Sequence, residues 1–297
     1  MTHLLISGTR HGVIMRPEIN EYFAQISILA IEGTYLHRHC QINRIPCQII
    51  SISDDIEEIL GAYDFDIYLS HGSPHILSGT FIENCRREKR TLLNLHPSVL
   101  PYFKGSNGII RSLIEKKGFG CSLHHINEKI DEGDVIDFEE ISVTDDMRDV
   151  PFATSVINMI EAEVFFRAIR SKLEKKNNSF SSIDPKYDHD QFRYSSFWAT
   201  PKIVLDKSLN FDWLVNFCAV RQEAPIRLRI GPHWHNLHGC SKVSNKWLVT
   251  CSATYEVGMI VFCGGRSIVI KSEQGLYKLD FDFFTQDSHQ PGLKIYS

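Results

Sequence analysis

Residues 91–105 read TLLNLHPSVLPYFKG, and the fold of the N-terminal part of the chain can be worked out from this stretch. The run 91–95 predicts a strand, which Pro97 ends because proline cannot donate a hydrogen bond to a sheet. Asn94 and His96 lie two residues apart at the end of this strand, so their side chains project from the same face. Ligands usually bind at the carboxyl ends of strands in open α/β sheets. The stretch therefore predicts a sheet edge that carries two polar side chains.

Strand-like and helix-like segments alternate on both sides of this stretch. The predicted strands before it are 3–7, 26–31, 45–52 and 65–69, and the predicted helices are 54–62 and 81–88. After it, the pattern predicts a helix over 108–117, a strand over 119–126 and a long helix over 152–173. Such alternation is typical of βα units around a mostly parallel sheet. We therefore expect an α/β domain over residues 1–173.

A change in the pattern marks a second domain. Residues 174–198 are polar, rich in turn formers and without periodicity, which is typical of a linker. After a predicted helix over 211–220, the predicted strands are short: 226–230, 247–250, 258–263, 267–271 and 277–283. Residues 199–297 are therefore expected to form a smaller β-rich domain that resembles an open barrel.

Composition and charge exclude several classes of protein. The 297 residues are 43% hydrophobic and 23% charged, which are ordinary values for a globular protein and argue against disorder. The formal net charge of -4 divides into -7 for residues 1–194 and +3 for residues 195–297. A charge this small disfavours a nucleic-acid binder, which needs a strongly basic surface. The change of sign coincides with the predicted domain boundary.

The eight cysteines and the length of the apolar runs indicate the compartment. No two cysteines form a CxxC pair, so we expect reduced, mostly buried thiols in a cytosolic protein. No run approaches the roughly 20 apolar residues that cross a bilayer. The apolar run near the N-terminus is too short for a signal sequence. The sequence therefore predicts a cytoplasmic protein without a membrane segment.

A second polar stretch, residues 120–136 (GCSLHHINEKIDEGDVI), contains Asp131, which could reach His96 from across a cleft. An imidazole beside a carboxylate is a competent general base, because the carboxylate fixes the tautomer and stabilises the charged form. The amide of Asn94 could donate to a developing oxyanion. The set fits acyl transfer without a protein nucleophile. Residues that only form turns are an equally good interpretation of the pattern alone.

Together, the two stretches resemble the signature of the folate-dependent formyltransferases. The family pattern is Asn-x-His-Pro-Ser-Leu-Leu-Pro, a glycine shortly after it and then Leu-Asp-x-Gly, which residues 94–105 and 130–133 follow closely. The resemblance implies the formyltransferase fold, a Rossmann-like, mostly parallel sheet, with N10-formyltetrahydrofolate as co-substrate and no metal. It also implies that His96 moves the proton of an attacking amine and that Asn94 holds the tetrahedral oxyanion. Asp131 would orient His96 and raise its pKa.

The resemblance also implies residues that bind the two substrates. The segment after strand 65–69 and the loop before Asp131 are expected to hold the pterin end of the folate, through Pro74, His75, Ile76, Leu77, Asn127 and Lys129. The loop after the first strand and the segment after Pro101 are expected to face the acceptor, through Thr9, Arg10, His11, Tyr102 and Lys104. For the first of these loops, a solvated turn is an equally good interpretation.

The identity of the acceptor follows partly by elimination. The C-terminal domain is similar to the one found in methionyl-tRNA formyltransferases and in some sugar formyltransferases. Its charge of +3 is too small for a tRNA-binding surface, and the glycinamide ribonucleotide enzymes usually end after one domain. We therefore expect a nucleotide-linked amino sugar, formylated for a surface polysaccharide such as a lipopolysaccharide O-antigen. The alternatives are a methionyl-tRNA formyltransferase and a 10-formyltetrahydrofolate hydrolase, whereas a non-catalytic binding protein would be expected to have lost one of the three catalytic residues.

Side chains of the kinds that bind zinc cluster in the C-terminal domain, at His233, His235, His238 and Cys240. Such close spacings along an extended segment converge poorly on one ion, so we expect no metal there. The expected partners are the folate and the amino sugar, with no nucleic acid and no membrane. The oligomeric state, with a homodimer as one option, stays open.

Overall fold

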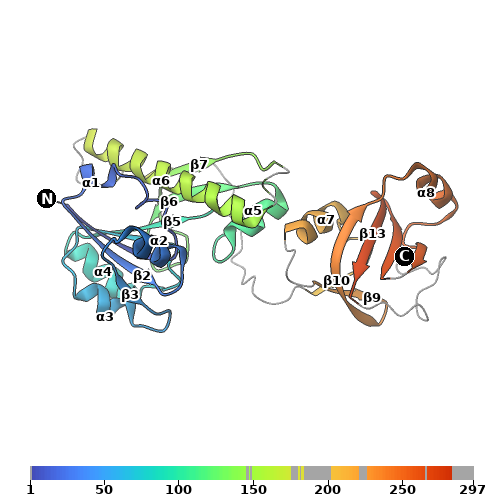
Figure 1. Cartoon of the computed structure of the whole chain (residues 1–297), viewed down its shortest axis with the longest axis horizontal. Helices are drawn as coiled ribbons and strands as arrows, with labels where there is room; N and C mark the ends of the chain where they lie inside the picture. Colours follow the sequence, from blue (N-terminus) through green and yellow to red (C-terminus); the bar gives the residue numbers. More distant parts are fainter. Residues whose placement is uncertain are drawn as a thin grey trace. The chain divides into compact units, whose positions relative to one another are not determined.

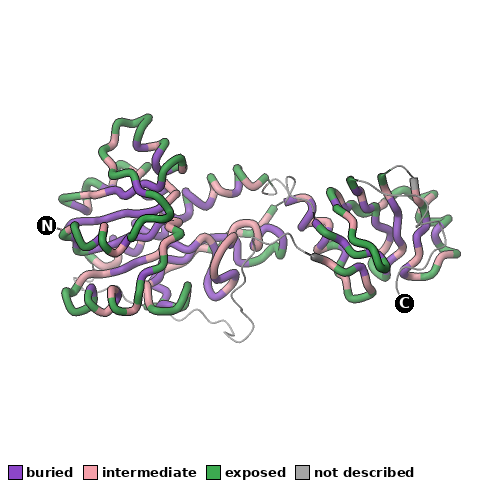
Figure 2. Tube along the Cα trace, turned by 90° about the horizontal axis from the view of Figure 1, so that it is seen from below, coloured by how far each residue is buried: buried purple, intermediate pink, exposed green. Residues whose placement is uncertain are grey.

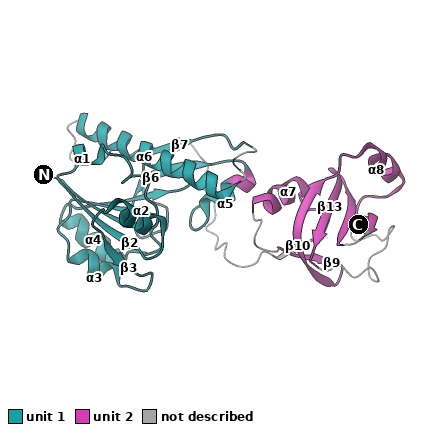
Figure 3. Ribbon diagram, viewed as in Figure 1, with its two compact units in different colours: residues 1–112, 116–195 teal, residues 113–115, 196–297 magenta. Residues whose placement is uncertain are grey.

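The computed structural model describes residues 2–144, 147, 149–174, 180, 182–183, 202–220, 226–264 and 266–282. The chain divides into two compact units, residues 1–112 with 116–195 and residues 113–115 with 196–297, which Figure 3 shows in separate colours. The domain bounds 1–173 and 199–297 stay a prediction, and most of the predicted linker 174–198 lies outside the described residues.

One part of the predicted linker packs against the first unit. Phe180 is buried, and its ring lies edge-on to the ring of His125 at a centroid distance of 6.4 Å. The amide of Ile183 donates to the carbonyl of Val135 at 2.7 Å. These contacts join a polar segment to the sheet through two apolar residues.

Seven strands form the sheet of the first unit: β1 (His3–Gly8), β2 (Gln25–Ile31), β3 (Gln48–Ile50), β4 (Ile67–His71), β5 (Thr91–His96), β6 (Gly120–His125) and β7 (Val135–Glu140). Their order across the sheet is β3-β2-β1-β4-β5-β6-β7. The first five pair in parallel, whereas β6 is antiparallel to β5 and β7 is antiparallel to β6. The predicted mostly parallel α/β sheet is confirmed. The order reverses between β1 and β4, which is where open sheets usually bind ligands.

The two central strands, β1 and β4, are buried along their whole length, and Figure 2 shows such buried stretches inside the first unit. Strands covered on both faces carry apolar runs, which here are residues 4–6 of β1 and 67–69 of β4. Tyr68 lies within the second run and is fully buried, and its hydroxyl lies 2.9 Å from Ser7 Oγ. Burial raises the pKa of Tyr68 to about 12. The hydroxyl therefore stays neutral and keeps the hydrogen bond that a buried polar group requires.

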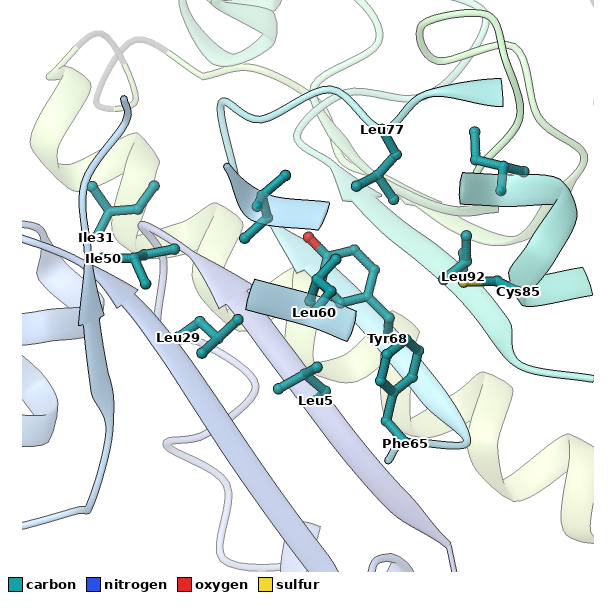
Figure 4. Packing of buried hydrophobic residues seen from close by; sticks show 12 residues of the cluster. Leu5, Leu29, Ile31, Ile50, Leu60, Phe65, Tyr68, Leu77, Cys85 and Leu92 are labelled. Atoms are coloured by element: carbon teal, nitrogen blue, oxygen red, sulfur yellow. The ribbon is translucent and has the colours of Figure 1, made fainter. Parts of the chain in front are cut away.

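In the part of the chain that the structure describes, six helices accompany this sheet: α1 (Ile19–Tyr22), α2 (Tyr35–Asn43), α3 (Ile56–Gly61), α4 (Gly79–Arg87), α5 (Gly108–Glu115) and α6 (Val150–Glu174). Leu29 and Ile31 of β2 pack with α3 and α4, in the cluster that Figure 4 shows. Ile28 and Ala30 point to the other face and pack with α2. The 25-residue helix α6 packs against β6 and β7, as Figure 1 shows. Helices therefore cover both faces of the sheet.

The second unit is built on a mostly antiparallel sheet: β8 (Lys202–Val204), β9 (Ile226–Ile230), β10 (His233–Lys242), β11 (Ile260–Gly264), β12 (Ser267–Ser272) and β13 (Gly275–Phe281). The order is β11-β12-β13-β10-β9-β8, and β8 and β9 pair in parallel. Its helices are α7 (Phe211–Val220), α8 (Lys246–Cys251) and the 3₁₀ turn η3 (Ser252–Thr254). The prediction of a smaller β-rich unit is confirmed. No helix within the described ranges is both long and apolar enough to cross a membrane.

The strand predicted over 247–250 is wrong, because these residues lie in helix α8. The side chain of Asn245 accepts hydrogen bonds from the amides of Trp247 and Leu248, at 3.0 and 3.2 Å. Such a cap satisfies the free amides of a first helical turn. Leu248 then packs against the small apolar cluster around Val261. The cap and this contact outweigh the preference of a bulky apolar run for a strand.

Candidate active site

The predicted catalytic residues meet at the end of β5. Asn94 and His96 point from the same face of this strand, and the antiparallel register places His124 of β6 directly opposite Asn94. Asp131 lies in the loop that joins β6 to β7. Its carboxylate Oδ2 is 3.3 Å from His96 Nδ1, and its Oδ1 accepts a hydrogen bond from Asn94 Nδ2 at 3.2 Å. The structure therefore brings the three residues into direct contact.

The loop that carries Asp131 has a tightly constrained backbone. Asp131 itself has a φ of 53°, in the left-handed region that costs a residue with a Cβ of the order of 1 kcal/mol or more. A Cβ on Gly133 would lie 1.7 Å from the carbonyl oxygen of His125, so no larger residue fits this position. The amide of Gly105 donates to Asp131 Oδ2 at 2.7 Å and links the loop to the segment after β5. The carboxylate is thus held from both sides.

His96 is almost completely buried, with 3% of its surface exposed. Both of its ring nitrogens face an acceptor, because Nδ1 faces Asp131 and Nε2 lies 3.0 Å from the carbonyl oxygen of Phe103. The imidazolium can donate at both ends, whereas the neutral ring leaves one lone pair against an oxygen. Burial nevertheless lowers the pKa of His96, although the charge of Asp131 acts in the opposite direction. The expected raising effect of Asp131 is present but is outweighed by desolvation.

For Asp131, the neighbouring groups change the pKa more than burial does. Burial alone would raise its pKa, but the facing rings of His96 and His124 and the Gly105 amide all stabilise the carboxylate. Together they hold the pKa of Asp131 well below its usual range. The group is therefore ionised at any working pH and can compensate a positive charge on His96.

The amide nitrogen of Asn94 already has two partners. It donates to Asp131 and lies 3.0 Å from Nε2 of His124, whose Nδ1 is 2.8 Å from the carbonyl oxygen of His125. With the proton on His124 Nδ1, Nε2 accepts from Asn94. With a proton on Nε2, the ring instead donates to Asp131 Oδ1, which lies 3.5 Å from that nitrogen. An oxyanion that approaches Asn94 must therefore take over one of two hydrogens that are in use.

The residues predicted to hold the folate lie on two loops at the sheet edge. Pro74 and Ile76 are exposed, the latter by 70%. His75 lies 3.1 Å from both Ser73 Oγ and the Ser51 carbonyl oxygen, so its ring ties this loop to the chain after β3. The side chain of Leu77, in contrast, is buried in the core (Figure 4). At this position only the backbone is free to meet a ligand.

The other two predicted folate residues form a turn before Asp131. Asn127 Oδ1 accepts from the amide of Lys129 at 3.0 Å, and Lys129 Nζ lies 3.7 Å from a carboxylate oxygen of Glu132. The side chain of Lys129 is 76% exposed. The contacts of both residues are thus local, and they shape the loop that carries Asp131.

The predicted acceptor loop after β1 is fastened to the neighbouring strand β4. Thr9 Oγ1 donates to the carbonyl of Gly72 at 2.9 Å. The His11 ring packs against those of Tyr35 and His39 of α2, at centroid distances of 6.1 and 5.1 Å. Burial, followed by the nearby His39, lowers the pKa of His11. Thr9 and His11 therefore shape the surface above β1.

Arg10 differs from the other two residues of this loop, because its guanidinium points into the protein. Its Nη2 lies 2.7 Å from Glu161 Oε1 and donates to the carbonyl of Leu95 at 2.9 Å. The side chain is only 12% exposed. This geometry gives Arg10 two protein partners, and its contact with the acceptor stays a prediction.

Tyr102 and Lys104, the other predicted acceptor residues, lie after Pro101. The side chain of Tyr102 packs over Gly118, where an added Cβ would lie 2.9 Å from Tyr102 Cβ and 3.0 Å from the first atom of its ring. Lys104 is buried apart from 8% of its surface, and its Nζ lies 3.2 Å from Glu132 Oε1. The Lys104 ammonium is thus a buried cation next to the turn that carries Asp131, and the exposed Lys129 ammonium lies beside the other oxygen of Glu132.

The His and Cys cluster of the second unit lies along the strand β10. Successive side chains of a strand point to opposite faces, and a register shift between Leu237 and Gly239 changes this alternation within the cluster. His235 packs against Phe281, His238 pairs with Asp282, and Cys240 is buried. Among the residues that the structure describes, no group of three or more His, Cys, Asp or Glu side chains is arranged to hold a metal ion.

Sequence reasoning missed three polar residues around the site: His71, His124 and Glu161. All three are buried, and each contacts a predicted site residue or its partner. His124 stands in the quoted stretch 120–136, but only the antiparallel register of β6 shows that it faces Asn94. Glu161 stands among the apolar residues of the long predicted helix, which indicates a buried carboxylate. Because a buried carboxylate requires a partner, this position was the available signal for an ion pair.

Comparison with known proteins identifies the fold and the family that this site resembles. Residues 51–169 match the family model described as formyl transferase, which confirms the predicted resemblance over that segment. A trifunctional purine biosynthetic protein adenosine-3 from Bos taurus is 38% identical over 89 residues, which are 30% of this chain and 8% of that protein. A GDP-perosamine N-formyltransferase from Brucella melitensis is 26% identical over 132 residues, which are 44% of this chain and 49% of the relative. The matches span less than half the length of these two relatives.

The solved structures extend the fold similarity to nearly the whole chain. An N-formyltransferase from Helicobacter canadensis, solved in complex with folinic acid and dTDP-3-aminofucose, superposes with a TM-score of 0.62 at 16% identity. The match covers 95% of this chain and 100% of that one. The chain therefore has the formyltransferase fold, and the fold class predicted from the sequence is confirmed.

Proposed function

We propose that this protein transfers a formyl group from N10-formyltetrahydrofolate to the amine of a nucleotide-linked amino sugar. The observation that carries the proposal is the direct contact of Asn94, His96 and Asp131 within the segment that matches the formyl transferase model. The choice of substrates is supported by the Helicobacter structure, which holds a folate and an amino-sugar nucleotide, and by the name of the Brucella relative. A formylated sugar nucleotide would serve the assembly of a surface polysaccharide.

In the first step, the substrate amine attacks the formyl carbon and forms a C–N bond while the carbonyl oxygen becomes an oxyanion. Asn94 would donate to this oxyanion with one of the two amide hydrogens that now serve Asp131 and His124. Because the donor is part of a preformed network, little reorganisation is needed beyond a small turn of the amide. His124 would lose one contact in exchange.

In the second step, the attacking nitrogen gives up its proton and the bond from the formyl carbon to N10 of the folate breaks. Neutral His96, favoured by its burial, would accept the proton at Nε2, directly or through water, once that nitrogen turns from the Phe103 carbonyl towards the substrate. The resulting imidazolium keeps its Nδ1 proton on Asp131, whose negative charge compensates it. His96 would then return the proton to N10, so that tetrahydrofolate leaves as a neutral amine.

The substrate-binding roles of the remaining predicted residues belong to the same proposal. The exposed loop with Pro74, His75 and Ile76 would hold the pterin, the core position Leu77 would contribute only backbone groups, and the turn with Asn127 and Lys129 would close this pocket. Thr9, His11, Tyr102 and Lys104 would face the acceptor. The eight free cysteines support a cytoplasmic location, where such thiols stay reduced.

The test is a direct assay with a panel of acceptors. The protein is mixed with N10-formyltetrahydrofolate and with nucleotide 3- and 4-amino sugars, initiator methionyl-tRNA, glycinamide ribonucleotide or buffer alone, and tetrahydrofolate release is followed. Release that depends on an amino sugar is expected. Release with tRNA alone, or equal release in buffer, would overturn the proposal in favour of a tRNA formyltransferase or a hydrolase. His96→Ala should abolish the release, whereas the matched control His238→Ala, on the exposed face of the second unit, should not.

A further inference from the structure

A buried ionic network lies beside the proposed catalytic residues and has no part in the steps above. Glu161 of α6 has no exposed surface, and its carboxylate binds Arg10 at 2.7 Å and His71 Nε2 at 2.8 Å. Arg10 in turn donates to the carbonyl of Leu95 at 2.9 Å. Burying such groups carries a desolvation cost that apolar residues of similar size would avoid. The network therefore calls for an explanation other than stability.

Arg10 contacts the Leu95 carbonyl at the end of β5, next to the proposed catalytic residues. Leu95 stands between Asn94 and His96, and the parallel pairing of β4 with β5 ends at the pair His71–Leu95. The next residue of β4's chain, Gly72, has a φ of 71° and turns the chain away. The carbonyl of Leu95 thus lies at the end of the ladder, where the guanidinium supplies the donor.

Gly72 is also what makes room for this donor. A Cβ at this position would lie 3.1 Å from Arg10 Cζ and 2.8 Å from Thr9 Oγ1. The amides of Thr9 and Arg10 both donate to the carbonyl of His71, at 3.1 and 3.2 Å. Backbone and side chain of the β1 loop are therefore fixed against the ends of β4 and β5 together.

We propose that Arg10, held by Glu161, is a positioning residue that fixes the end of β5 and with it the side chains of Asn94 and His96. His71 completes the network by holding the second oxygen of the same carboxylate. The inference rests on the proposed formyl transfer, since the residues positioned are those assigned to that chemistry. It is an alternative to the predicted acceptor contact of Arg10.

Arg10 also acts on His96 through its charge. The groups that face His96 are the Asp131 carboxylate, the His124 ring, the Phe103 carbonyl and the Arg10 guanidinium. Burial lowers the pKa of His96 most, Asp131 raises it, and the charge of Arg10 lowers it further. Loss of that positive charge favours the imidazolium, so Arg10→Met should raise the pKa of His96 and move the acid limb of kcat/KM to higher pH.

The experiment compares two double variants that each remove an ion pair of helix α6. The test variant is Arg10→Met with Glu161→Leu, in which apolar residues replace the buried pair. The matched control is Arg167→Met with Asp137→Leu, which removes the pair between α6 and β7 at 2.6 Å. Loss of the Leu95 hydrogen bond should lower kcat about tenfold in the test variant, with the KM of both substrates within about threefold of wild type. The control should keep its kcat.

The outcomes separate this inference from the proposed function. If the wild-type protein formylates no acceptor, the proposed function fails. If the wild type is active and the test variant matches the control in kcat, only the positioning role fails. A higher acceptor KM at unchanged kcat would instead make Arg10 a substrate ligand and overturn the inference. Should the double variant not fold, Arg10→Met with Glu161→Gln replaces it, because the amide of the glutamine keeps a hydrogen-bond partner for His71 while the donor to Leu95 is still lost. An unchanged kcat in that variant would also overturn the inference.

Discussion

Asp131→Asn is the substitution that tests the candidate site most directly. Oδ2 of Asp131 accepts from the Gly105 amide at 2.7 Å and faces His96 Nδ1 at 3.3 Å, while Oδ1 accepts from Asn94 at 3.2 Å. An asparagine keeps the shape but replaces one of these oxygens by an NH₂ group. In one orientation that group faces Gly105 and His96, and in the other it faces Asn94. Either way it meets donors, so at least one hydrogen bond is lost.

The expected changes in the free energy of unfolding and in kcat follow from these contacts. A hydrogen bond to a charged group contributes about 1.5–3 kcal/mol, and the desolvation of the carboxylate, which the variant avoids, offsets part of the loss. We therefore expect the free energy of unfolding to fall by about 2 kcal/mol. The rate should suffer more, because a general base that is wrongly oriented and lacks a counter-charge forfeits about 10²–10⁴ in kcat. A fall of about 10³ corresponds to about 4 kcal/mol of transition-state stabilisation.

The assay is amine-dependent release of tetrahydrofolate over a range of pH, together with urea unfolding. Because the charge of Asp131 raises the pKa of His96, the acid limb of kcat/KM should move to lower pH in the variant. The matched control is Asp137→Asn, which removes a carboxylate of β7 that pairs with Arg167. A folded variant with kcat within about tenfold of wild type, or an acid limb that moves to higher pH, would refute the assignment of Asp131.

Three further predictions concern stability. Gly133→Ala places a Cβ 1.7 Å from the His125 carbonyl oxygen, so urea unfolding should show a loss of more than about 2 kcal/mol; a loss near zero would mean that the loop can shift freely. Asn245→Ala removes the cap of α8 and should cost the second unit about 1 kcal/mol, whereas Asn245→Asp should cost much less. Because the pKa of Asp131 is held well below its usual range, its contribution is complete above about pH 4 and is lost as pH falls through the folded-state value. Wild type should therefore lose stability below about pH 4 more steeply than Asp131→Asn, and parallel curves would contradict this.

Much of the fold could be predicted because its signals are local. The strands β1, β2, β4 and β5 are apolar runs between polar loops, and each was predicted within about two residues at either end. The helix α7 was predicted over its full length, 211–220. The strand β7 was missed because its sequence, VIDFEE, ends in charged residues, and its carboxylates at 137 and 139 face Arg167 of α6. Arg167 is about 30 residues away from these carboxylates in sequence, so the local sequence around β7 does not indicate the contact.

In the candidate site, too, local contacts could be predicted from the sequence, whereas contacts between distant segments could not. Asn94 and His96 could be placed together from the period of a single strand. The contact of Asn94 with His124 depends on the antiparallel register of β6, whereas the surrounding alternation of strands and helices favours parallel neighbours. The inward turn of Arg10 depends on a carboxylate 151 positions away in sequence, at Glu161. Polar loop residues are ordinarily solvated, so loop position alone predicts a substrate contact for Arg10 and gives no sign of this buried partner. The substrate contact itself stays a prediction.

The backbone conformation of the site could not be predicted from the local preferences of its residues. Two non-glycine residues in contact with His96 have left-handed backbones, Phe103 with a φ of 55° and Asp131 with a φ of 53°. Each costs stability relative to a glycine at the same position, of the order of 1 kcal/mol. The Phe103 carbonyl and the Asp131 carboxylate are the two acceptors that face the His96 ring. A glycine at 131 would relax the backbone but remove one of them. At residue 131 the left-handed backbone favours glycine, whereas the contact with His96 requires a carboxylate. The chain has an aspartate there and so keeps the contact at the expense of backbone stability.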